Sequence, residues 1–169
     1  GEFRPLDLIE SKYSELKSSG VQFPDQFDKL LSNIGTLRRH TSQNEQNIFP
    51  AHGDLAFPNV LVSDGQVLLI DFECSAMSGF LYDLCKYVRH LPIEKEVLSR
   101  LIVDLIPGAK DDLTREAEHV MIVAGIWMVL RLYIQIAIGD NVEENLVQLK
   151  KYTSRLYALV DKVNPSLMK

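Results

Sequence analysis

The chain has 169 residues, of which 46% are hydrophobic and 24% are charged. These proportions are near globular averages and exclude disordered, collagen-like and disulfide-scaffold proteins. Lysine and arginine number 18 against 23 acidic residues, and the formal net charge of -5 argues against a nucleic-acid partner. The two cysteines lack zinc-ligand spacing, which favours a reducing, cytoplasmic location.

The length predicts a single domain. Residues 1–3 have no apolar signal core and are typical of a cloning scar, so we expect the domain to occupy 4–169. Within it the pattern predicts helices over 4–47, a loop and hairpin over 48–73, and a helical subdomain over 74–169. The expected fold class is α+β and mainly α-helical.

The amino-terminal part of the chain has two apolar stripes at helical spacing. They predict a helix around 6–16 and a second helix around 27–37. The second begins at Pro24-Asp25 and is followed by a polar run over 40–47, which we interpret as a loop.

The middle of the chain changes to a strand pattern. Short apolar runs at 60–62 and 67–70 flank Ser63-Asp64-Gly65-Gln66, and Asp-Gly is the preferred pair for a two-residue type I′ turn. The sequence therefore predicts a β-hairpin. Its register pairs Val62 with Val67, Val60 with Leu69, and Asn59 with Ile70.

The rest of the chain has helical spacing. We expect one helix to end at Pro92, another to end at Pro107-Gly108, a long apolar helix over 116–138, and a last helix over 142–163. The long apolar segment approaches the length of a membrane span, but Arg131 and Gln135 interrupt it. A core helix is the favoured interpretation, so no membrane partner is expected.

Polar residues gather where the predicted hairpin opens. The turn places Asp71 beside Asn59, and the loop that holds Asp54 lies at the same end of the ribbon. Carboxylate and amide oxygens suit Mg²⁺ with substrate phosphates and disfavour zinc. Phosphoryl transfer uses such a set, with Asp54 as the candidate base and Asn59 and Asp71 as the metal ligands. His52 is expected to brace the loop backbone.

These residues carry a resemblance to a known family. His52-Gly53-Asp54 with Asn59, followed by Ile70-Asp71-Phe72-Glu73, resembles the catalytic loop and metal-binding segment of the aminoglycoside phosphotransferase and choline kinase-like family, which has a protein kinase-like fold. The resemblance extends through Asp83, which by that match supports the catalytic loop together with Gly53.

The resemblance implies a kinase-like C-terminal lobe, with the hairpin carrying the catalytic and metal-binding segments. It also implies Mg²⁺ and ATP, or another nucleoside triphosphate, as cofactors, bound through Asn59 and Asp71. The acceptor is then a hydroxyl group of a small molecule. Its identity is not encoded in any motif found here.

Each candidate residue also has a simpler interpretation. Asp54 and Asp71 suit loops and turns, His52 suits a buried structural role, and Asn59 and Asp83 suit a strand start and a helix N-cap. Other residues have simple interpretations as well. The two cysteines are typical small core residues, Glu73 is typical of an exposed strand end, and a solvated helix face explains four further acids: Glu116, Glu118, Glu143 and Glu144.

The sequence has no glycine-rich phosphate loop and no strand lysine ahead of His52. We therefore expect an N-terminal kinase lobe as the missing partner, and self-association through the exposed lobe interface. The chain alone should be inactive. Two alternatives stay open: a natural single-lobe pseudokinase or binding module, and a metal-dependent phosphate-ester hydrolase or nucleotide-binding module.

Overall fold

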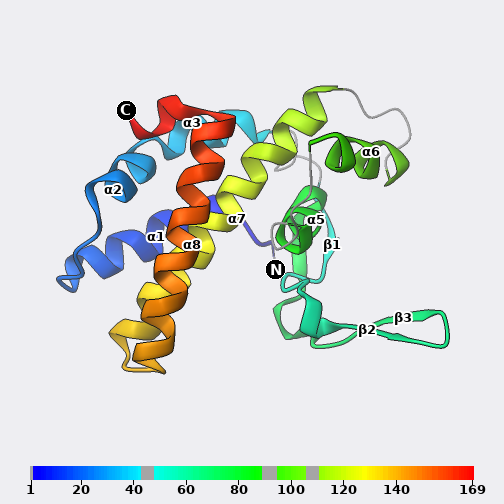
Figure 1. The fold of residues 1–169 in the computed structure, drawn as a ribbon, viewed down its shortest axis with the longest axis horizontal. Helices are drawn as coiled ribbons and strands as arrows, with labels where there is room; N and C mark the ends of the chain where they lie inside the picture. Colours follow the sequence, from blue (N-terminus) through cyan, green and yellow to red (C-terminus); the bar gives the residue numbers. More distant parts are fainter. Residues whose placement is uncertain (1, 43–47, 89–94, 106–110) are drawn as a thin grey trace. The chain divides into compact units, whose positions relative to one another are not determined.

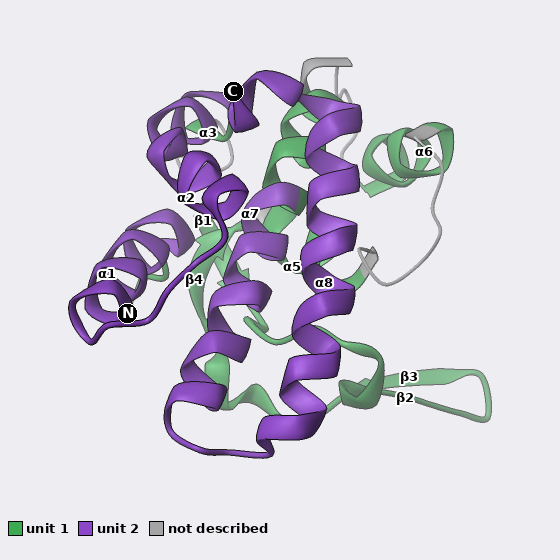
Figure 2. Ribbon diagram, turned by 60° about the vertical axis from the view of Figure 1, so that its left-hand side comes forward, with its two compact units in different colours: residues 1–3, 41–121 green, residues 4–40, 122–169 purple. Residues whose placement is uncertain are grey.

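The computed structural model describes residues 2–42, 48–88, 95–105 and 111–169 (Figure 1). The chain forms two compact units, shown in different colours in Figure 2. Unit 1 comprises residues Gly1–Phe3 and Thr41–Met121, and unit 2 comprises Arg4–His40 and Ile122–Lys169. The predicted helix ends at Pro92 and Pro107-Gly108 and most of the predicted loop over 40–47 lie outside the described residues.

Unit 2 consists of helices. They are α1 (Pro5–Ser18), α2 (Asp25–Ser32), α3 (Ile34–His40), the carboxy-terminal part of α7 (Asp111–Ala137), α8 (Val142–Val163) and the 3-10 turn η3 (Pro165–Met168). All of these helices contribute to one apolar core, whose fully buried members include Leu6, Phe27, Leu37, Ile126, Leu130 and Val160. The α7–α8 contact is close at Gly125, where an added Cβ would lie 3.0 Å from Leu156. The predicted helices are therefore confirmed here, with one correction.

The predicted single helix over 27–37 is wrong, because the chain forms two helices that meet at Asn33. The Asn33 side-chain amide donates to the carbonyl oxygens of Lys29 and Leu167, both at 3.1 Å. Its own carbonyl accepts the first hydrogen bond of α3, from Thr36 N–H at 2.9 Å. Asparagine competes with helical hydrogen bonding in this way, and the apolar spacing alone did not reveal the break.

Unit 1 combines short strands with helices. Its elements are β1 (Ile48–Ala51), η1 (Phe57–Asn59), β2 (Val60–Ser63), β3 (Gln66–Leu69), η2 (Phe72–Cys74), β4 (Ala76–Gly79), α5 (Phe80–Val88), α6 (Lys95–Leu105) and the first part of α7. The predicted hairpin is confirmed, and Val62 pairs with Val67 and Val60 with Leu69. Its turn residues Asp64 and Gly65 have φ values of 51° and 75°, as a type I′ turn requires.

Strands β1 and β4 form a second antiparallel pair, which the sequence did not predict. Phe3 N–H donates to the Met77 carbonyl beside this pair, and the Phe3 ring packs edge-on against Tyr82 at a centroid distance of 5.3 Å. Residues 2 and 3 are thus packed within unit 1, while their interpretation as a cloning scar stays a prediction.

The hairpin extends away from the other strands and α5 of unit 1 (Figure 1). Its apolar side chains are exposed on both faces: Leu61, Val62, Val67, Leu68 and Leu69, followed by Ile70 and Phe72. Val62 reaches 72% exposure. Soluble proteins rarely leave a contiguous apolar surface of this kind uncovered.

Helix α7 contains the segment that approached a membrane span. By length and composition, Leu113–Ala137 is able to cross a bilayer, with a mean hydropathy of 1.9, but core helices of soluble proteins pass the same test. Five of its residues lie in the core of unit 2: Ile122, Val123, Ile126, Val129 and Leu130. The packing accords with the interpretation as a core helix.

Candidate active site

The loop over His52–Asp54 is held by helix α5. The Asp83 carboxylate accepts the backbone N–H of His52 at 2.5 Å and that of Gly53 at 3.0 Å. Charge-assisted hydrogen bonds of this kind are about twice as strong as neutral ones. A single carboxylate thus fixes two consecutive amides of the loop.

One turn further along α5, Lys86 binds the other side of the same loop. Its Nζ lies 2.6 Å from the Gly53 carbonyl oxygen and 2.6 Å from Asp54 Oδ1. The Lys86 side chain is only 5% exposed, and the Asp54 side chain is 26% exposed. The Asp54 carboxylate is therefore accessible while one of its oxygens is paired with a buried ammonium.

Gly53 occupies a position that no other residue fits. Its φ is 76°, in the left-handed region, and a Cβ built on it would lie 2.1 Å from the Cys74 carbonyl oxygen. Because that neighbour is backbone, the end of η2 at Cys74 would have to move to make room for any side chain. This close approach packs the catalytic loop candidate against the segment that follows Asp71.

His52 links the loop to the end of the hairpin. Its ring is buried, Nε2 lies 2.8 Å from the Ile70 carbonyl oxygen, and Asp54 N–H donates to Nδ1 at 3.3 Å. Because Nδ1 accepts this bond, Nε2 carries the ring proton and donates to Ile70. Both nitrogens are engaged with backbone groups, so the ring serves to brace the loop.

Asn59 and Asp71 lie at the open end of the hairpin. Ile70 N–H donates to the Asn59 carbonyl at 3.1 Å, so these two residues face each other as the predicted register requires. The Asn59 amide donates through Nδ2 to the Asp54 carbonyl oxygen at 2.9 Å. A carbonyl only accepts, so the NH₂ end of the amide must face it and the amide oxygen remains available.

Asp71 has φ 65° and ψ 59°, a strained left-handed conformation for a residue with a side chain. Its carboxylate is exposed, and among the described residues it forms no hydrogen bond or ion pair. The Asn59 oxygen and the Asp71 carboxylate are hard donors of the type that Mg²⁺ prefers, so the residues present fit this ion. The described ranges contain no group of three or more His, Cys, Asp and Glu side chains that could bind a metal.

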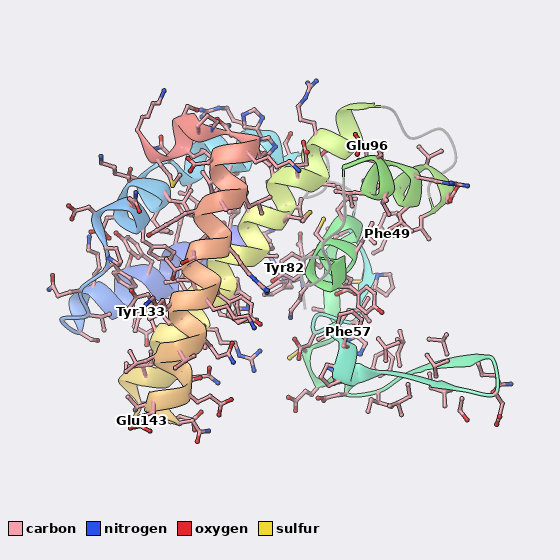
Figure 3. The ribbon with its side chains drawn as sticks, in the orientation of Figure 1. Phe49, Phe57, Tyr82, Glu96, Tyr133 and Glu143 are labelled. Atoms are coloured by element: carbon pink, nitrogen blue, oxygen red, sulfur yellow. The ribbon has the colours of Figure 1, made fainter. Side chains whose placement is uncertain are left out.

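Two expectations about other residues are wrong. Cys74 is exposed and is not a core residue, whereas Cys85 is buried, and burial raises the pKa of its thiol. Glu116 is buried at 6% exposure and does not belong to a solvated helix face, while Glu143 and Glu144 are exposed (Figure 3 labels Glu143). Residue type alone did not distinguish the buried acid on α7 from the exposed acids on α8.

Lys86 is the contact residue that the sequence analysis did not single out. A lysine on an amphipathic helix is normally solvated, so its type gave no signal. Its position did give a signal. Lys86 follows Asp83 by three residues and buried Tyr82 by four, and this spacing places it on the inward face of α5.

Comparisons with solved structures identify the fold. The chain is similar to the crystal structure of a choline/ethanolamine kinase family protein from Mesorhizobium loti, with a TM-score of 0.83, 18% identity, and coverage of 98% of this chain and 57% of that chain. It is also similar to a choline kinase from Cryptosporidium parvum Iowa II, with a TM-score of 0.60, 16% identity, and coverage of 98% and 59%. The fold is thus kinase-like and α+β, as predicted.

The family follows from the sequence. The family model for choline/ethanolamine kinase matches residues 5–99, which is more than half of the chain. The chain belongs to this family, and the resemblance to choline kinase-like proteins is confirmed. No curated protein matches the sequence significantly. The chain spans less than two thirds of the length of the two similar structures.

Proposed function

We propose that the chain is the carboxy-terminal lobe of a kinase that uses ATP, or another nucleoside triphosphate, and Mg²⁺ to phosphorylate a hydroxyl group of a small molecule. The observation that carries the proposal is the Asp54 carboxylate. It lies on a loop that α5 fixes through Asp83 and Lys86, and the Asn59 amide donates to the backbone carbonyl of Asp54. The His52 ring of the same loop binds the carbonyl of Ile70, the residue before Asp71. Membership of the choline/ethanolamine kinase family supports it.

Asp54 is the base in this proposal. Its carboxylate receives the proton of the acceptor hydroxyl while that oxygen forms a bond to the γ-phosphorus. The bond from the γ-phosphorus to the bridging oxygen breaks, and a nucleoside diphosphate leaves. Asn59 and Asp71 would hold Mg²⁺, which would neutralise negative charge on the phosphates. His52 keeps the loop in shape and moves no proton.

The missing partner in this proposal is an N-terminal kinase lobe. The exposed apolar side chains of the hairpin and the adjacent Phe72 support it, since such a surface is covered in a stable protein. The same surface would lead the isolated chain to self-associate and to turn over poorly. The acidic composition supports a protein without a nucleic-acid partner, and a cytoplasmic location is part of the proposal.

Two substitutions in the full-length protein test the roles. Choline and ethanolamine are the first acceptors to try, because they name the family. We expect Asp54→Asn to lower kcat by about 10²–10⁴-fold and to leave nucleotide binding intact, since a general base contributes about this factor. We expect Asp71→Asn to abolish Mg²⁺-dependent turnover, measured by phosphate transfer to the acceptor.

Asp64→Asn is the matched control, because Asp64 is an exposed turn residue whose positive φ asparagine also adopts. It should leave kcat unchanged. Normal turnover in Asp54→Asn would show that another group is the base. Phosphate release that needs no acceptor would favour a hydrolase.

The second candidate function is a single-lobe binding module without catalysis, which the same exposed hairpin surface favours. The native mass of the protein in its source cells distinguishes the two. An antibody raised against this chain should detect a band well above 19.2 kDa if an N-terminal lobe is present. A band near that mass would favour the binding module.

A further inference from the structure

Lys86 has an unusual environment for a lysine. Only 5% of its side chain is exposed, and its acceptors, the Gly53 carbonyl and the Asp54 carboxylate, belong to the loop that carries the candidate base. Together with Asp83 it makes α5 a two-sided clamp, because Asp83 accepts from the loop amides and Lys86 donates to the loop carbonyl and carboxylate. No motif in the sequence assigned a function to Lys86.

Stability alone does not account for an ammonium at this position. Burying a charge costs several kcal/mol of solvation, and ordering a lysine side chain costs further entropy. A methionine has similar length and would fill the same space without the solvation cost. The charge therefore points to a role at Asp54, the carboxylate with which Lys86 forms an ion pair.

We propose that Lys86 is a positioning residue for phosphoryl transfer. Its ammonium, anchored on the Gly53 carbonyl, fixes the orientation of the Asp54 carboxylate, so that the base meets the acceptor hydroxyl in one geometry. This inference rests on the proposed function, because it requires Asp54 to act as the base. Lys86 keeps its proton throughout and acts only through Asp54.

A double-mutant cycle tests the proposal in the full-length protein, with Mg²⁺, ATP and choline or ethanolamine as probes. Lys86→Met should lower kcat by about 10- to 100-fold, since a displacement of about 1 Å in a catalytic group has an effect of this size. The KM for ATP should stay within about twofold of the wild-type value, because Lys86 acts on the base and not on nucleotide binding. Lys86→Arg should restore part of kcat because it keeps the charge and the donors.

The decisive measurement is Lys86→Met in an Asp54→Asn background. We expect no further loss of kcat there, because a residue that acts through Asp54 has no effect once the carboxylate is gone. A full additional loss in that background, or an unchanged kcat in Lys86→Met alone, would overturn the proposal. If Lys86→Met does not fold, Lys86→Gln replaces it in the cycle, since glutamine keeps a donor for Gly53.

Thermal unfolding of the same four proteins separates this proposal from the proposed function. Coupling between Lys86 and Asp54 in the unfolding midpoint reports the ion pair without any turnover. Coupling in both stability and kcat supports the positioning role, whereas coupling in stability alone assigns the pair to the fold and overturns it. Absence of turnover in the wild type with either acceptor would contradict the proposed function, and with it the catalytic role of Lys86, while leaving the ion pair measurable.

Discussion

The two units stabilise their structures by different means. Unit 2 buries an apolar core of leucine, isoleucine, valine and phenylalanine, supplied by all of its helices. Unit 1 also buries apolar residues on α5, α6 and α7, but its buried set includes His52, Asn59 and Lys86, and its hairpin exposes apolar side chains. Both the buried polar residues and the exposed apolar residues of unit 1 lie close to the candidate site in the sequence.

This difference shows where the chain departs from what stability favours. Buried polar groups cost free energy unless they are paired, and exposed apolar groups gain none. The proposed function would account for both departures in unit 1, since the paired polar groups fix a loop and the proposed N-terminal lobe would cover the exposed surface. Unit 2 also exposes large apolar side chains, at Ile138, Leu146 and Val147, but its described residues bury no charged side chain. The comparison is testable by substitutions in each unit.

The largest effect is expected in the core of unit 2. Phe27 is fully buried and lies in an aromatic cluster, with Phe23 at a centroid distance of 5.5 Å. Phe27→Ala should lower the free energy of unfolding by about 3–5 kcal/mol, because it removes buried area and leaves a cavity. Urea denaturation of the 169-residue chain measures it.

Val62→Thr on the hairpin is the control for that measurement. Val62 is 72% exposed, and threonine keeps the strand preference, so the change should be within about 0.5 kcal/mol at protein concentrations where the chain is monomeric. A loss above about 1 kcal/mol would mean that the hairpin is covered in solution, and the contrast between the units would fail.

A smaller effect on stability is expected at two glycines of unit 1, where two matched alanine substitutions should differ in their effect on kcat. Gly53 and Gly65 both have positive φ, but only Gly53 has a backbone atom where its Cβ would lie. Gly53→Ala should cost more than about 2 kcal/mol and lower kcat of the full-length protein by at least about 10²-fold, since the loop must shift. Gly65→Ala should cost only about 1 kcal/mol and leave kcat unchanged.

Equal effects of the two alanine substitutions on kcat would contradict the role of the Gly53–Cys74 contact. Stability and turnover are measured on the same preparations, so a general loss of folded protein is separated from a displaced loop.

The smallest effect is expected at Tyr157 in unit 2, whose hydroxyl is buried and has no hydrogen-bond partner in the part of the chain that the structure describes. Burial first, and then the nearby Tyr133 and Asp28, raise the pKa of Tyr157 to about 12. Its folded pKa exceeds the ordinary value of 10.0, so its contribution to stability is present below pH 10 and is lost as the pH rises through about 12.

Tyr157→Phe should therefore leave stability at pH 7 unchanged or raise it by up to about 1 kcal/mol, because an unsatisfied polar group is removed. The advantage of the variant should grow between pH 9 and 11.5 in urea titrations. A variant that is clearly less stable at pH 7 would mean that the hydroxyl has a partner in solution.

Local rules were sufficient for part of the fold. The hairpin register followed from Asp64-Gly65, because these two residues determine the turn. The turn then determines which residues of the two strands face each other. The helices of unit 2 followed from apolar spacing, apart from the break at Asn33, where a side chain competes for backbone groups. The proximity of Asn59 and Ile70 followed from the same turn.

Contacts between distant segments were not predictable in the same way. Strand β4 has only one large apolar residue, Met77, so no alternation marked it as a strand. The burial of Lys86 depends on α5 packing against the loop, and residue type argued for exposure. Family resemblance supplied Asp83 but not Lys86, whose signal was its spacing from a known supporting residue.

The anchoring of the loop by Asp83 has a consequence for the order of folding. The two partners are 31 residues apart, and Asp83 binds main-chain amides that every sequence provides. The loop therefore acquires its shape only after α5 has formed and the intervening hairpin segment has closed the distance. During synthesis the loop of His52, Gly53 and Asp54 is made before α5, so it lacks the partner that fixes its backbone until α5 has formed. A chain that ended before Asp83 would contain the whole motif and lack its geometry.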